Sequence, residues 1–116
     1  MGLPWVRLDT QMPSNPKILY LIEDKNSHSA FVWACSLSYS GAHGTDGFIP
    51  KAALKTIHGT LKDAKNLVDV GLWIPVPGGW EVNDWADFQP SSDEHQERKE
   101  RARAAAMLRW HGKVDA

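Results

Sequence analysis

Lysine and arginine residues stand in two segments of this 116-residue chain where they could bind phosphate groups. The first segment, residues 60–70, mixes polar and apolar residues at the spacing of a helix. Lysine can donate hydrogen bonds to guanine and asparagine can pair with adenine, so these residue types suit contacts with DNA. Asp63 and Asp69 share the polar positions, and we expect them to repel a polyanion there. The candidates for DNA contact in this segment are Thr60, Lys62, Lys65 and Asn66.

The second segment, residues 97–113, is strongly basic, with six lysines and arginines against two glutamates, a net charge of +4. Residues 1–90 carry seven basic and nine acidic side chains, a net charge of −2. The body of the chain therefore has little long-range attraction for a polyanion. We interpret the basic segment as the part that would clamp phosphates. Its candidate residues are Arg98, Lys99, Arg101, Arg103, Arg109 and Lys113.

The basic segment is predicted to form a helix over about residues 93–110. Two of its glutamates precede an arginine by four residues, as in Glu97 and Arg101, and this spacing stabilises an exposed helix. Residues 102–110 also supply an apolar side. In a second interpretation this side packs on another copy of the chain, and the helix makes a homodimer.

No arrangement of residues in the sequence is typical of a catalytic or metal centre. The five histidines lack a metal-ligand spacing, and there is no nucleophile elbow, phosphate-binding loop or paired-carboxylate motif. We therefore expect no enzyme activity, no cofactor and no metal. The single cysteine, Cys35, excludes an internal disulfide framework and fits a reducing cytoplasm. No apolar run approaches the roughly 20 residues of a membrane span, so we expect no membrane association.

The first half of the chain is predicted to contain two helices. The first runs from about residue 16 to 24, after an asparagine cap and a proline at its first position. The second, about residues 28–40, is apolar on nearly all sides, so we expect it to be central in the fold. We expect this second helix to begin at a cap formed by Ser27 or Ser29 and to end at Gly41.

The second half is predicted to contain two helices and a hairpin. Helix 51–58 and helix 60–70 are separated by so short a connection that they resemble a helix-turn-helix unit. Gly71 is expected to end the second of them with a positive φ. Strands 72–76 and 80–83 then flank a proline and two glycines, which is a hairpin signal.

These elements predict a mainly α fold with a small β-hairpin, in the α+β class. With a short extended segment at residues 48–49, their order is that of a winged helix-turn-helix with an extra N-terminal helix and a basic C-terminal helix. The expected division is a winged-helix domain at 1–90 and a basic C-terminal helix or tail at 91–116. The expected core is Leu19, Ile22, Trp33, Leu37, Ile49, Leu54, Ile57, Leu67, Val68, Trp73, Trp80 and Val82.

Three stretches of the chain, residues 45–50, 67–73 and 78–85, resemble the N-terminal winged-helix domain of phage replication proteins, the replisome organisers. The extended segment at 5–10 and the glutamate- and arginine-rich helix fit the same group, so that the resemblance covers about residues 4–103. It implies DNA binding, at an origin for example, or docking of replication partners. The longer members of this group continue into a second domain.

Two functions follow from these observations. The first is a small phage-type winged-helix protein that binds double-stranded DNA in replication or transcription control. It would act in the cytoplasm of a phage-infected or lysogenic bacterium. The second is a winged-helix interaction module that binds a host or phage protein and has no enzyme activity. The near-neutral body favours the second function, and the basic segment favours the first.

Overall fold

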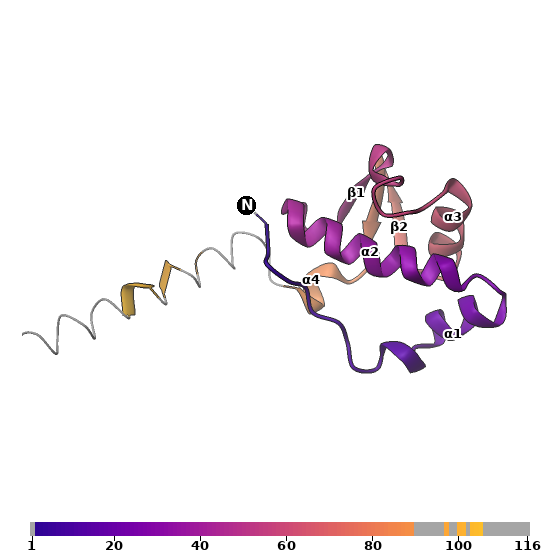
Figure 1. Cartoon of the computed structure of the whole chain (residues 1–116), viewed down its shortest axis with the longest axis horizontal. Helices are drawn as coiled ribbons and strands as arrows, with labels where there is room; N and C mark the ends of the chain where they lie inside the picture. Colours follow the sequence, from indigo (N-terminus) through magenta and orange to yellow (C-terminus); the bar gives the residue numbers. More distant parts are fainter. Residues whose placement is uncertain (1, 90–96, 98–99, 102, 106–116) are drawn as a thin grey trace, which may run out of the picture.

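The computed structural model describes residues 2–89, 97, 100, 101 and 103–105. This part of the chain is mainly helical with a small antiparallel sheet (Figure 1), which confirms the α+β class. The expected boundary near residue 90 and most of the basic segment lie outside the described residues. In chain order the elements are η1 (Met12–Ser14), α1 (Pro16–Glu23), α2 (Ser27–His43), β1 (Phe48–Pro50), η2 (Lys51–Ala53), α3 (Leu61–Asp69), β2 (Trp73–Val76), β3 (Gly79–Val82) and α4 (Trp85–Phe88).

Helix α2 is the element around which the others are arranged, because α1, α3 and β1 all pack against it (Figure 1). Its central place was predicted, but both of its expected ends are wrong. Its N-cap position is Asn26, so neither expected serine caps it, and Ser29 is buried. The helix continues through Gly41 to His43, and Gly44 ends it in the left-handed conformation, with φ of 65°.

Gly41 has a packing role in place of the expected stop. It is buried, and its carbonyl accepts a hydrogen bond from the Leu3 amide at 2.6 Å. A β-carbon at Gly41 would collide with the side chain of Val6. The glycine therefore lets the N-terminal arm, residues 2–11, lie directly on the surface of α2. The extended segment expected at 5–10 belongs to this arm and forms no strand.

The sheet has three described strands in the order β1-β3-β2, with both pairings antiparallel. The predicted hairpin is confirmed, with Val76 opposite Gly79 and a two-residue turn in which Gly78 has φ of 84°. Pro75 lies on the edge strand β2, where its missing N–H interrupts no second pairing. The short strand β1 pairs with the other side of β3 and so closes the sheet against α2.

Helix α3 begins and ends as its sequence predicts. Thr60 is the N-cap and makes a reciprocal capping box with Asp63, and Gly71 follows the helix with φ of 84°. The helix predicted at 51–58 is wrong, because this stretch is the short 3-10 helix η2 followed by turns. It ends with His58, not Gly59, in the left-handed conformation. Eight residues with a single apolar side are too few to hold an α-helix without a cap at either end.

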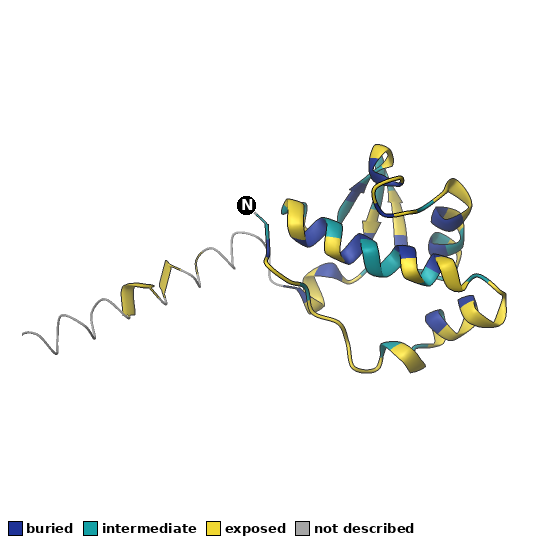
Figure 2. Ribbon diagram, viewed as in Figure 1, coloured by how far each residue is buried: buried dark blue, intermediate teal, exposed yellow. Residues whose placement is uncertain are grey.

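The core lies between α2, α3 and the inner face of the sheet (Figure 2). Of the residues predicted there, Trp33, Val68 and Trp80 are only half-buried at its edge. Leu19 and Ile22 were placed in the core wrongly, since their side chains are 43% and 51% exposed. The residues that are buried as expected are Leu37, Ile49, Leu54, Ile57, Leu67, Trp73 and Val82.

The error in α1 has a simple cause. Residues 18–22 are apolar all round the helix, so their pattern does not tell which side faces α2. In the structure Ile18 and Leu21 are buried, and the opposite side of the helix is left exposed.

Candidate nucleic-acid interface

Helix α3 exposes both of its lysines. Lys62 and Lys65 are exposed, as predicted for candidate DNA contacts. Leu61, an apolar residue of the same segment, is 61% exposed at the start of the helix. Because Leu61 is the first residue of α3, its side chain lies beyond the edge of the core that Ala64 and Leu67 reach.

Asp63 does not share the exposed surface, contrary to expectation. Its side chain is buried, with 7% of the residue exposed. Ser29 Oγ donates to Asp63 Oδ1 at 2.7 Å, and the Thr60 amide and hydroxyl both donate to Oδ2 at 3.0 Å. The carboxylate is therefore directed inward by its partners, and it does not oppose an anion at the helix surface.

The environment of Asp63 keeps its charge. Burial raises the pKa of this carboxyl, but the hydrogen bonds from Ser29 and Thr60 lower it further than burial raises it. His28, whose Nε2 lies 4.0 Å from Oδ2, adds a smaller lowering. The resulting pKa is below the ordinary value for aspartate. A buried, ionised side chain thus fixes the start of α3 on the start of α2.

The other two candidates on α3 are engaged in the same network. The Thr60 hydroxyl accepts a hydrogen bond from the Asp63 amide at 3.2 Å. Asn66 is half-buried, and its Nδ2 donates to Ser29 Oγ at 3.1 Å. Both side chains therefore hold α3 in place, while the two lysines are the candidates whose ends project from the helix.

Two further lysines, Lys51 and Lys55, precede α3 and were not among the candidates predicted from the sequence. Both are exposed, in η2 and in the turns that follow it. The Lys51 amide donates to the Gly78 carbonyl at 3.0 Å, so Lys51 lies beside the tip of the β2–β3 hairpin. The hairpin tip has no basic residue of its own, and Lys51 brings a positive charge to it. The sequence could have pointed to Lys51 only if the pairing of β1 with β3 had been foreseen.

In the stretch 48–68 the exposed formal charges have a single sign. Residues 48–68 contain four lysines, all exposed, and one acidic residue, the buried Asp63. Asp69, at the end of α3, is exposed and marks the limit of the surface. These four exposed lysines are candidates for phosphate contacts, while Glu81, exposed on β3 opposite Phe48, places an acid next to the same stretch.

The basic segment is described at only a few positions. Arg101 and Arg103 are helical and exposed, and Arg101 pairs with Glu97 at 3.7 Å, as the four-residue spacing predicted. Both groups of this pair are well exposed, so it contributes little stability. The other candidates, Arg98, Lys99, Arg109 and Lys113, lie outside the described residues.

The histidines of the described part serve as packing and hydrogen-bonding groups. His28 Nε2 donates to the His58 carbonyl at 2.9 Å. The His28 ring is tilted against Phe31, and the His58 ring stacks on Phe31. His43 stacks on Tyr39. Among the described residues no group of three or more histidine, cysteine or acidic side chains is placed to hold a metal ion.

Comparison with known proteins found no matching family model, no matching curated protein and no matching solved structure. Within the described ranges, the helices are all too short or too polar to cross a membrane.

Proposed function

We propose that this protein binds double-stranded DNA through a winged helix-turn-helix unit and acts in replication or transcription control of a phage. The observation that carries this proposal is the exposure of Lys51, Lys55, Lys62 and Lys65 in one stretch of the chain whose acid, Asp63, is buried. The order α2, β1, η2, α3, β2, β3 and the sheet order β1-β3-β2 support the winged-helix assignment.

In this proposal α3 enters the major groove with Lys62 and Lys65, which donate to phosphates or to guanine edges. Lys51 contacts the phosphate backbone beside the hairpin tip, and the Gly78 turn approaches the same strand. Most of the affinity is electrostatic, because lysines that pair with phosphates release counterions from the DNA. The arginines of the basic segment clamp the adjacent phosphates and supply the attraction over distance that the body lacks.

The test is a titration of a labelled random-sequence duplex with the full chain, followed by fluorescence anisotropy. The variant with both Lys62→Gln and Lys65→Gln should bind about tenfold more weakly at low salt, because two cations that face the phosphates are removed. Lys25→Gln is the matched control, since Lys25 is also exposed but lies between α1 and α2. Equal weakening by the control, or no binding to any duplex at low salt, would contradict the proposal.

A second function, a module that binds a host or phage protein, has its own supporting observation. Apolar side chains of the arm and of α1 face the solvent, with Trp5 77% and Tyr20 64% exposed. Large apolar side chains that face the solvent support an interaction surface where they form a contiguous patch. If DNA binding is absent, this function takes its place, and substitution of Tyr20 by Gln should weaken binding of the partner without change in fold.

A further inference from the structure

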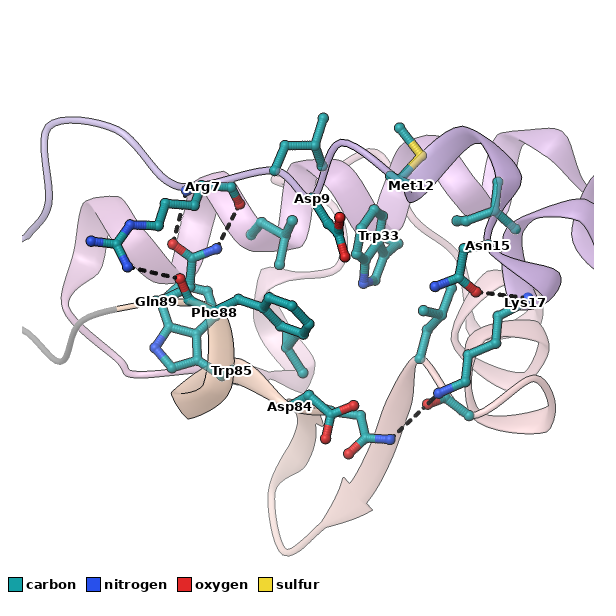
Figure 3. A pocket seen from close by; sticks show the side chains of 17 residues that line it. Arg7, Asp9, Met12, Asn15, Lys17, Trp33, Asp84, Trp85, Phe88 and Gln89 are labelled. Carbon is teal, nitrogen blue, oxygen red and sulfur yellow. Dashed lines mark hydrogen bonds between the residues drawn. The ribbon is translucent and has the colours of Figure 1, made fainter.

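A cavity of about 130 Å³ lies between the N-terminal arm and the body of the protein (Figure 3). Its lining comes from the arm, α1, α2 and the corner where β3 meets α4. This cavity lies apart from Lys62 and Lys65, which do not line it, so it is independent of the proposed DNA contacts. A space of this size holds a side chain, since a single water occupies only about 10–15 Å³ of such volume.

The wall that the arm contributes is held in a fixed position. The Arg7 amide donates to Gln89 Oε1 at 2.8 Å, and Gln89 Nε2 donates to the Arg7 carbonyl at 2.7 Å. The carboxamide of Gln89 thus pairs with Arg7 as a neighbouring strand would, and Gln89 is buried, with 5% of the residue exposed. This pairing and the hydrogen bond from the Leu3 amide to the Gly41 carbonyl hold the arm on the body of the protein at two points.

Two carboxylates line the cavity without a cation to pair with. Asp9 Oδ1 accepts only the Gln11 amide, at 2.8 Å, and no salt bridge joins Asp9 or Asp84 to another described residue. Asp84 occupies the N-cap position of α4, yet its side chain makes no capping bond there, because its backbone is left-handed, with φ of 63°. Both carboxylates can therefore accept further hydrogen bonds from a ligand.

The cations that border the cavity are already bound to the main chain. Arg7 Nη1 donates to the Phe88 carbonyl at 3.4 Å, and Figure 3 shows its guanidinium directed away from the cavity. Lys17 Nζ donates to the Gly71 carbonyl at 3.0 Å, at the far end from Phe88. Both cations keep their charge and belong to the lining, but among the described residues neither forms an ion pair with Asp9 or Asp84.

Aromatic rings form the walls between the two carboxylates. Trp33 and Phe88 both border the space, and Phe88 is 48% exposed. In Figure 3 the Asp9 carboxylate lies beside the Trp33 ring, and Asp84 lies on the opposite wall. Flat aromatic faces attract cations, and the planar guanidinium group stacks on them better than an ammonium does.

We propose that this cavity binds the guanidinium group of an arginine side chain that another protein presents. The rings of Trp33 and Phe88 hold the plane of the group, and the carboxylates of Asp9 and Asp84 accept its N–H donors. The arm is part of the site because it carries Asp9. Charge complementarity favours arginine because neither carboxylate has a partner cation among the described residues; the buried, unpaired Trp85 Nε1 of the lining is a donor and takes no part in this binding.

The test uses the full chain and N-acetyl-arginine methylamide, with the citrulline analogue as an uncharged ligand of nearly the same shape. Binding is followed by NMR through the indole Nε1–H signal of Trp33. We expect a saturable shift with the arginine compound and an affinity at least about tenfold weaker with citrulline, for which the charge-assisted bonds are absent. Equal responses to the two compounds, or no response to either, would overturn the proposal.

Two variants locate the effect. Asp9→Asn keeps the oxygen that accepts the Gln11 amide, and Asp84→Asn keeps a residue type that tolerates the left-handed backbone. Each should weaken arginine binding about tenfold, as expected for removal of one charged partner. Glu23→Gln, an exposed acid of α1 outside the cavity, is the control and should change nothing. DNA affinity should stay unchanged in the Asp9 and Asp84 variants, so failure here and failure of DNA binding are distinct results.

Discussion

Helices α1 and α3 differ in the chemistry of their outer surfaces, although α2 packs against both. Helix α3 presents Lys62 and Lys65 to solvent, whereas α1 presents Leu19, Tyr20 and Ile22. The way in which each helix is held differs as well. A buried polar network around Asp63 fixes α3, whereas α1 is held mainly by the apolar side chains of Ile18 and Leu21.

One small domain thus exposes two chemically different surfaces, and each matches one of the two proposed functions. A charged surface held by directional hydrogen bonds suits a phosphate backbone with fixed spacing. An apolar surface beside a cavity suits a protein partner. The candidate residues for the two proposed functions lie on different helices, so each proposal can be tested by its own substitutions.

The largest effect is expected within α3 itself, between its two leucines. Leu67 is fully buried and Leu61 is 61% exposed. Leu67→Ala should lower the free energy of unfolding by about 2–5 kcal/mol, because it leaves a cavity in the core. Leu61→Ala should lower it by less than about 0.5 kcal/mol. Urea denaturation of both variants measures the difference, and similar losses would show that the orientation of α3 is wrong.

The next effect concerns the network that distinguishes α3 from α1. Asp63→Ala removes the capping box and leaves Ser29 and the Thr60 amide without their acceptor. We expect a loss of about 1–3 kcal/mol of stability at neutral pH, measured by urea denaturation.

The pH dependence of this contribution has a definite sign. The pKa of Asp63 is lowered on folding, so its contribution is present above the ordinary aspartate pKa, about 4, and is lost as pH falls below that value. The stability difference between wild type and Asp63→Ala should therefore shrink on acidification. A difference that stays constant from neutral pH to well below the ordinary aspartate pKa would contradict the inward, ionised carboxylate.

The smallest effect on stability is expected on the outer side of α1. Ile22 is 51% exposed, so Ile22→Gln should change the free energy of unfolding by less than about 0.5 kcal/mol. The measurement is the same urea titration, with Ile18→Gln as the buried counterpart from the opposite side. If Ile22→Gln destabilises the protein as strongly as Ile18→Gln does, Ile22 is buried and the apolar side of α1 is not exposed to solvent.

The parts of the fold that could be predicted depend on residues close together in the chain. The capping box needs only Thr60 and Asp63, and the positive φ of Gly71 follows from its place after a helix. The hairpin turn is likewise set by residues 76–79. Each of these features is decided by local backbone geometry, which residue types report directly.

The parts that could not be predicted depend on contacts across the chain. The inward direction of Asp63 requires Ser29, 34 residues away. The arm wall of the cavity requires Arg7 and Gln89, which are 82 residues apart. The sequence also placed Lys51 at the start of helix 51–58, whereas Lys51 begins the short 3-10 helix η2 and its amide contacts Gly78 beside the hairpin tip. The sequence thus indicated the two α3 lysines of the candidate site, but it did not indicate Lys51 and Lys55, which precede α3.

The central claim is that the exposed lysines of residues 48–68 bind DNA phosphates, and its most direct test is the salt dependence of duplex binding. The affinity of the full chain for one duplex is measured at several salt concentrations, and the slope of log affinity against log salt is compared between variants. A variant with Lys51, Lys55, Lys62 and Lys65 all changed to Gln is expected to show a shallower slope of log affinity against log salt. The slope should decrease by about 0.9 for each phosphate that is no longer neutralised. A slope that is unchanged in this variant would contradict the account.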